Sequence, residues 1–213
     1  MDLLEVIRTT HACRYYKTDA VPDNLLLKVL DAARWAPTGS NRQPVTYVAV
    51  RDATKRRALH DLYQPGWNAI MQKYASGEIS SGFKPGFLAH VDHFAQHLYE
   101  VPVMIVVCAA VNQINAIDAN LGRLSVAGGS SIYPAVQNLM LAARNEGLGT
   151  TLTTLLCARE PEVQTLLGIP AEIATTAMIT LGWPARPFPR KLVRKPLAEV
   201  AYLDTYGAPL LGA

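Results

Sequence analysis

The chain has 213 residues, of which 50% are hydrophobic and 17% are charged, and its formal net charge is +3. This length suits one sizeable domain, and the composition excludes an intrinsically disordered chain. The positive charge is too small to indicate a nucleic-acid-binding protein, and the longest apolar run, from Val101 to Val111, is too short to cross a bilayer.

Cysteine usage and the N-terminus indicate the compartment. Cys13, Cys108 and Cys157 are odd in number and far apart, which predicts free thiols in a reducing cytosol. The first ten residues lack a basic stretch followed by a long apolar one, so we expect no signal peptide. These features predict a cytoplasmic protein.

The first fifty residues predict two helices and a strand. Asp2 and Glu5 resemble a capping box at the start of a short helix. Asp23 is expected to cap a second helix, which carries apolar residues at helical spacing and ends before Pro37. The run VTYVAV, residues 45–50, is typical of a strand.

A charged helical pattern over residues 53–62 leads into a segment without clear periodicity, from Tyr63 to Glu100. This segment is rich in glycine, proline and aromatic residues. So long an irregular segment in a compact domain is usually a lid or a binding element. We therefore expect Tyr63 to Phe87 to cover a substrate site, and we expect a second irregular insertion from Asn112 to Gly129.

The second half of the chain predicts two buried strands, each flanked by helices. The apolar runs at residues 101–111 and 175–182 are typical of strands that are covered on both faces. Ser131 is expected to cap a helix that ends at Gly147, and a short helix is expected from Pro161 to Gly168. Buried strands separated by helices predict a three-layer α/β/α sandwich, built as one domain over residues 1–213.

The C-terminal tail, from Trp183 onward, combines basic residues with a strand-like end, EVAYLDTY, at residues 199–206. An arginine fork matches phosphate oxygens, so the basic residues are either a phosphate clamp or a solvated loop. They are Arg186, Arg190, Lys191, Arg194 and Lys195, with Arg8 and Arg14 as further candidates near the N-terminus.

A cluster of histidines precedes the first buried apolar run. His93 and His97 are spaced to share one helical face with Asp92 and His90 nearby, and metal ligands use this spacing. The alternative is an exposed amphipathic helix that leads into the strand at Val101. No further ligand motif accompanies the cluster, so we predict no metal site.

Six segments, in order, resemble the nitroreductase family of flavin enzymes over nearly the whole chain. They are HACRYYKTDAVP, ARWAPTGSNRQPVTYVAV, SIYPAVQNLMLAARNEGLGTTLTTL, LLGIPAEI, ITLGWPA and VRKPLAEV. The resemblance implies an α+β fold with a mixed, mostly antiparallel sheet, and a homodimer whose C-terminal tails reach across to the partner subunit. It also implies FMN in the groove between the subunits and NADH or NADPH as the electron donor.

The resemblance also assigns flavin contacts to residues of this chain. The family's phosphate-contacting run near the first helix matches Thr10, His11, Ala12, Cys13 and Arg14. Many members have Arg in place of Thr10 and Ser in place of Ala12, and Arg8 is a candidate replacement. The family's late phosphate-binding arginine matches Arg194. The loop that reaches in from the partner subunit matches Pro37, Thr38, Gly39, Ser40 and Asn41.

Thr153 and Thr154 fall where the family places the residues nearest flavin N5. A hydroxyl there can hydrogen-bond N5 and favours one-electron chemistry, as in members that resemble iodotyrosine deiodinase. The alternative is a β-prone sequence whose hydroxyls point into the sheet edge. The flavin carries the chemistry in this family, so we predict no acid–base residue.

The resemblance implies an oxidoreductase that uses NAD(P)H to reduce nitroaromatic, quinone or similar flat, electron-poor acceptors by a ping-pong mechanism. Two alternatives stay open. One is reductive dehalogenation or dehydrogenation on the same fold, and the other is a non-catalytic protein that stores FMN. The segment from Tyr63 to Phe87 favours an enzyme, because a storage protein needs no substrate lid.

Overall fold

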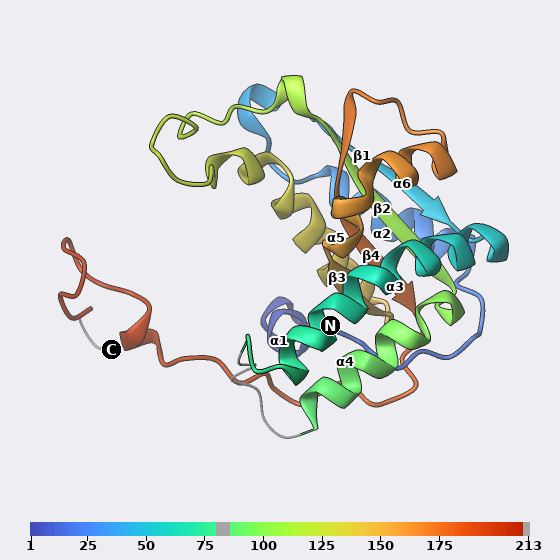
Figure 1. The fold of residues 1–213 in the computed structure, drawn as a ribbon. Helices are drawn as coiled ribbons and strands as arrows, with labels where there is room; N and C mark the ends of the chain where they lie inside the picture. The colour runs from blue at the N-terminus through green and yellow to red at the C-terminus, as the bar shows by residue number, and fades with distance from the viewer. Residues whose placement is uncertain (80–85, 211–213) are drawn as a thin grey trace.

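The computed structural model describes residues 1–79 and 86–210, and a four-stranded sheet forms its centre (Figure 1). The strand order is β1-β2-β4-β3, and every neighbouring pair is antiparallel. The strands span Val45–Val50 (β1), Val103–Ala110 (β2), Gly149–Thr153 (β3) and Ile173–Gly182 (β4). The one parallel contact in the described part of the chain is an isolated bridge between Ala12 and Thr150.

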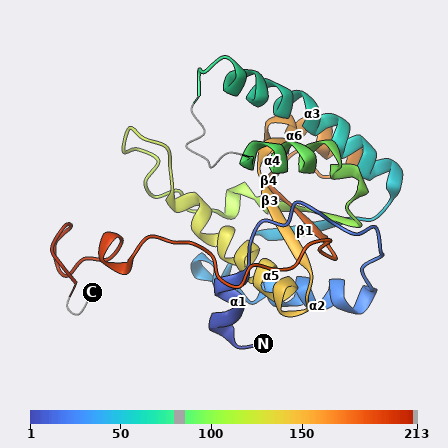
Figure 2. The same cartoon turned by 90° about the horizontal axis from the view of Figure 1, so that it is seen from below.

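Helices cover both faces of the sheet (Figures 1 and 2). On one side lie α1, α2 and α5, at Leu3–Thr9, Asp23–Arg34 and Tyr133–Asn145. On the other side lie α3, α4 and α6, at Ala53–Ala75, Phe87–Gln96 and Glu160–Leu167. The predicted α+β sandwich of three layers is confirmed.

The buried strand β2 joins the two halves of the core. Alternate side chains on a strand point to opposite faces, so Ile105 and Val107 pack with α2 and α5, whereas Met104 and Val106 pack with α3 and α4. All four side chains are almost fully buried. This explains why the sequence of β2 is a continuous apolar run.

Two predicted helix caps are wrong. Pro22 takes the N-cap position of α2, and Asp23 lies inside the first turn, where it pairs with Arg51. Ile132 takes the N-cap position of α5, because the Ser131 hydroxyl instead accepts a hydrogen bond from the backbone N–H of Gly39, at 3.0 Å. In both cases a tertiary contact takes the polar group that could have capped the helix.

The segment after Tyr63 is more helical than its sequence indicates. Helix α3 continues to Ala75 through Pro65, and α4 occupies much of the remainder. Burial stabilises this extension, since Tyr63 and Trp67 are only 4% and 6% exposed. Gly66 allows the helix to approach Leu155, because a Cβ atom there would lie 3.1 Å from that side chain. Part of the predicted lid, residues 80–85, lies outside the described residues.

The second irregular segment, between β2 and α5, is confirmed, and a buried carboxylate organises it. Asp118 accepts hydrogen bonds from the Ser125 hydroxyl, the Arg123 guanidinium and the backbone N–H of Val126. These bonds hold the pKa of Asp118 far below its usual range. Ile117 and Leu124 on the same segment are 88% and 89% exposed, so the segment is ordered yet presents apolar side chains to solvent.

The C-terminal tail leaves the body of the molecule in both views (Figures 1 and 2). Residues 199–206 were predicted as a strand, and this is wrong for the single chain. The tail forms a 3₁₀ turn at Leu197–Glu199 and a bridge between Tyr202 and Pro209. A strand needs a neighbour for its backbone groups, and this part of the tail lies beside no strand of its own chain. No helix among the described residues is long and apolar enough to cross a membrane.

Candidate functional site

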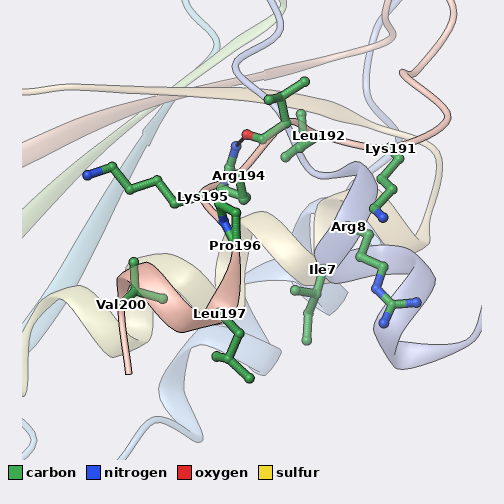
Figure 3. A pocket seen from close by; sticks show the side chains of 10 residues that line it. Ile7, Arg8, Lys191, Leu192, Arg194, Lys195, Pro196, Leu197 and Val200 are labelled. Atoms are coloured by element: carbon green, nitrogen blue, oxygen red, sulfur yellow. Dashed lines mark hydrogen bonds between the residues drawn. The ribbon is translucent and has the colours of Figure 1, made fainter. Parts of the chain in front are cut away.

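A cavity of about 880 Å³ separates α1 from the start of the tail (Figure 3). We call it the tail cavity. Arg8, Lys191, Arg194 and Lys195 provide its charges. Figure 3 shows Lys191 pointing toward Arg8, whereas Lys195 points the other way. No carboxylate of residues 1–79 or 86–210 forms an ion pair with any of these four cations.

The backbone fixes the tail against α1 at this cavity. The N–H of Leu192 donates a hydrogen bond of 2.9 Å to the carbonyl of Arg8. One guanidinium nitrogen of Arg194 donates to the carbonyl of Val193 at 2.8 Å, which leaves its other donors available. The cluster of unpaired cations therefore suits a phosphate group.

The predicted phosphate run follows α1, and one backbone and one side-chain hydrogen bond tie it to β3. The N–H of Cys13 donates to the carbonyl of Thr150 at 2.8 Å, and the Thr151 hydroxyl donates to the carbonyl of Cys13. Gly149 makes this approach feasible, because a Cβ atom there would lie 2.6 Å from the Cys13 sulfur. The N–H of Ala185 donates to the carbonyl of Tyr15, so the run lies between β3 and the start of the tail.

Two members of the run cannot supply the side-chain contacts of the family pattern. The Thr10 hydroxyl donates to the carbonyl of Val6 at 2.8 Å, and Ala12 has no polar side chain. His11 differs, because its Nδ1 atom is buried without a hydrogen-bond partner in the described structure. Burial lowers the pKa of His11, a hydrogen bond with the backbone of Thr9 partly opposes this shift, and Arg14 and Arg144 lower the pKa further. A buried polar atom without a partner and nearby unpaired cations fit an anionic ligand.

A second, smaller cavity of about 250 Å³ lies along the outer side of the same run. We call it the Tyr15 cavity. His11, Arg14 and Tyr15 line it from the run, His90 lines it from α4, and Arg186 lines it from the tail. The structure thus divides the predicted phosphate residues, because Arg194 lines the tail cavity whereas His11, Ala12 and Arg14 line the Tyr15 cavity.

Arg14 is the one arginine of the run, and it is half-buried. Its guanidinium carbon lies 4.8 Å from the centre of the Phe87 ring, and one nitrogen donates to the carbonyl of Ala12. Burial lowers the pKa of Arg14 without bringing it near neutrality. It is therefore a fixed positive charge near β3 and α4.

The two threonines predicted near N5 have different surroundings. Thr153 is half-buried, and its hydroxyl is hydrogen-bonded to Tyr63 and accepts from the backbone N–H of Leu155. Thr154 is exposed, and its side chain makes no hydrogen bond within the described residues. Only the Thr154 hydroxyl is therefore available to a ligand.

The loop at residues 37–41 lies at the opposite end of the sheet from the phosphate run. It enters β1 at Val45, which pairs with Ala109, and Ala109 in turn pairs with Ala174 of β4. The phosphate run instead contacts Thr150, which pairs with Leu181 of β4. One chain therefore does not bring Pro37, Thr38, Gly39, Ser40 and Asn41 to the other predicted flavin residues.

The loop itself is held in an uncommon conformation. Ser40, Asn41 and Gln43 have φ angles of 52°, 52° and 51°, in the left-handed region that costs energy for residues with a Cβ atom. The Thr38 hydroxyl accepts from the N–H of Gln43, and Arg42 donates to Asn115 of the irregular segment. Such strain is typical of a loop shaped for a ligand or a partner.

The histidines of α4 form a stack with Tyr15. The ring of Tyr15 lies 4.4 Å from His93, which lies 4.1 Å from His97, and the Tyr15 hydroxyl is 2.6 Å from Nδ1 of His90. No group of three or more His, Cys, Asp or Glu side chains among the described residues could hold a metal ion. The sequence did not indicate the pairing of His90 with Tyr15, since the two are 75 residues apart.

Comparison with known proteins identifies the family. A model described as the nitroreductase family matches residues 7–183. The chain belongs to this family. The predicted resemblance is confirmed, and the nitroreductase fold accounts for the arrangement of sheet and helices.

Relatives of known sequence or structure show how widely nitroreductases diverge. A Thermus thermophilus protein named NADH dehydrogenase is 30% identical, with 81% of this chain and 82% of that protein covered. Iodotyrosine deiodinase 1 of Mus musculus is 25% identical over 87% of this chain and 63% of its own length. A BluB-like flavoprotein from Clostridium difficile has a TM-score of 0.73 at 22% identity, with 96% of this chain and 100% of that chain covered.

The family and its relatives also confirm the class of reaction. Nitroreductases bind flavin, and relatives of this chain are named NADH dehydrogenase and NAD(P)H nitroreductase. The chain is therefore an NAD(P)H-dependent oxidoreductase.

Proposed function

We propose that this nitroreductase binds FMN in a groove between two identical subunits, each a single domain of residues 1–213. Arg8 and Arg194 hold the phosphate in the tail cavity. His11, Ala12 and Arg14 would line the cofactor, and Arg14 would supply a fixed positive charge that stabilises reduced, anionic flavin. The observation that carries this proposal is the cluster of four unpaired cations where α1 meets the tail.

The partner's loop at residues 37–41 completes the groove. Small residues and strained backbone allow close approach to a ligand, and Thr38, Ser40 and Asn41 offer hydroxyl and amide groups for the polar ring edge. These residues and the phosphate run lie at opposite ends of the sheet of one chain, which favours two subunits over one.

The reaction is a transfer of electrons from NADH or NADPH to a flat, electron-poor acceptor such as a quinone or a nitroaromatic compound. Bound FMN supplies the redox chemistry by accepting hydride from the donor and passing electrons on. Donor and acceptor would bind beside the flavin in turn, which would give ping-pong kinetics. The protein fixes the orientation of both and excludes water with the segment that includes α3 and α4.

The first experiment is to purify the protein and record its visible spectrum. FMN is expected at about one per subunit, identified after release by chromatography. Anaerobic addition of NADH or NADPH should bleach the flavin, and a quinone should restore its colour. A flavin that stays oxidised with both donors would contradict the proposed reaction and would favour FMN storage.

Thr154 supports a second candidate, reductive dehalogenation of a halogenated aromatic substrate. Its hydroxyl is exposed and free of partners in the described structure, as a contact to flavin N5 requires. We expect Thr154→Val to reduce halide release by at least tenfold while quinone reduction changes less than twofold. Thr153→Val is the matched control, because the Thr153 hydroxyl already bonds within the protein. Equal loss in both assays, or no halide release by the parent protein, would exclude this candidate.

A further inference from the structure

Positive charge lines the Tyr15 cavity, and a flavin phosphate bound in the tail cavity would not neutralise it. Arg14 and Arg186 line it together with His11 and His90. No carboxylate of the described residues lines it. Glu100 lies in the adjoining small cavity, where it faces Arg14 and His97. Two arginines without a carboxylate partner in one small cavity indicate a site for an oxyanion.

Aromatic rings hold both arginines in place. The guanidinium carbon of Arg186 lies 3.3 Å from the centre of the Tyr15 ring, and that of Arg14 lies over Phe87. Stacking of this kind occupies the flat face of a guanidinium and leaves the N–H groups around its edge free to donate. The hydrogen bond between Tyr15 and His90 fixes the ring on which Arg186 lies. The site is therefore preorganised.

The position of the cavity indicates which ligand carries the oxyanion. Arg14 belongs to both the cavity and the run assigned to FMN, so a ligand in the Tyr15 cavity lies next to the cofactor. Its other wall is α4, the end of the segment expected to cover the substrate. The donor or acceptor that faces the flavin is thus within reach of Arg186 and His90.

We propose that the Tyr15 cavity binds an oxyanion of the donor or acceptor and thereby selects anionic ligands for this enzyme. The inference rests on the proposed function, in which the tail cavity is occupied by the FMN phosphate. Two ligands can supply the oxyanion. One is NADPH, whose 2′-phosphate is absent from NADH, and the other is an acceptor that carries a carboxylate.

The test uses Arg186→Gln, with Arg190→Gln as the matched control, since Arg190 is an exposed arginine of the same tail that lines neither cavity. Calorimetric titration of the flavin-loaded protein compares NADP⁺ with NAD⁺ in one arm and 4-nitrobenzoate with nitrobenzene in the other. We expect Arg186→Gln to raise the dissociation constant of the anionic ligand in one arm by about tenfold or more. The dissociation constant of the counterpart without the extra anionic group should change less than twofold, and the FMN content should stay unchanged. The arm that responds identifies the source of the oxyanion.

Two results would overturn the inference. Equal changes in the dissociation constants of anionic and neutral ligands in both arms, or no change in either arm, would show that the cavity does not recognise an oxyanion. Loss of FMN from Arg186→Gln, with FMN retained by Arg194→Gln, would place the flavin phosphate in the Tyr15 cavity instead. A parent protein without FMN would refute the proposed function, and NADP⁺ titration of that protein would still test the cavity by itself.

Discussion

At the scale of single residues, the role of a polar side chain depends on which neighbour already takes its hydrogen bonds. Thr10 occupies the position of a family arginine, but its hydroxyl is committed to the carbonyl of Val6. Arg8, two residues earlier, faces the tail cavity without a carboxylate partner in the described structure. The positive charge missing at residue 10 is thus available from residue 8.

Arg194 gives the direct test of the phosphate site. Arg194→Gln removes one charge-assisted contact, which is worth about 1.5–3 kcal/mol, so the dissociation constant of FMN should rise roughly 10- to 150-fold. Equilibrium dialysis against FMN measures it. Arg190→Gln serves again as the control and should retain FMN like the parent. Parent-like affinity in Arg194→Gln would show that the phosphate lies elsewhere.

Sequence could predict the residue types of the site but not their grouping. Arg14, Arg194 and the loop at residues 37–41 were all identified from the sequence, whereas their division between two cavities and two ends of the sheet depends on strand register. The assignment of Ser131 as a helix cap failed for a similar reason. Its competing partner, the backbone of Gly39, lies 92 residues away in sequence.

At the scale of elements, helix α4 buries Phe94 and Ala95 in the core and stacks histidine side chains against Tyr15. Its contact with Tyr15 includes His90 and His93, and Arg186 lies on the opposite side of the same ring. Sequence could not indicate this arrangement, because the helix follows residues of irregular pattern. The same tertiary packing extends α3 past Pro65, against the local propensity of that proline.

The histidine stack predicts that acid loosens α4. Burial lowers the pKa of His93, and repulsion from His97, Arg186 and His90 lowers it further, whereas Glu100 acts in the opposite direction. The detached helix therefore takes up a proton at a higher pH than the packed one. Packing is fully favoured above the ordinary histidine pKa of about 6.5 and weakens as the pH falls below it.

Hydrogen exchange of α4 measured between pH 5 and pH 8 checks this expectation, after correction for the intrinsic rate. Protection of the helix should decrease on the acid side. His93→Phe keeps a ring against Tyr15 but cannot be protonated, so it should flatten the profile. The other charged or titratable groups around His93 are Arg14, Tyr15, Tyr16, His90, Asp92, His97, Glu100 and Arg186. A profile unchanged by His93→Phe would locate the titration in another group.

At the scale of the whole molecule, a single chain leaves apolar side chains exposed. It also keeps the loop at residues 37–41 apart from the other predicted flavin residues. Leu3 and Ile7 of α1 are 64% and 44% exposed. Val193 and Leu124 are each 89% exposed, on the tail and on the irregular segment. In the proposed dimer, a second copy covers these surfaces and brings the loop at residues 37–41 to the tail cavity of its neighbour.

Complementation between two damaged subunits tests this arrangement. Arg194→Gln damages the phosphate side, and the double variant Ser40→Gly and Asn41→Gly removes two loop side chains while keeping the positive φ angles accessible. If the loop serves the partner's flavin, a heterodimer of the two variants has one site with both defects and one site with none. If the loop serves its own chain, both sites are damaged.

Random mixing makes half of all dimers heterodimers, so about a quarter of the sites should be intact after the two variants are refolded together. Flavin content and quinone reductase activity should therefore rise to about a quarter of the parent values, from the low levels of each variant alone. Refolding each variant by itself is the control. A mixture that stays at the average of the two variants, with heterodimers confirmed by differently tagged chains, would mean that each subunit builds its flavin site alone.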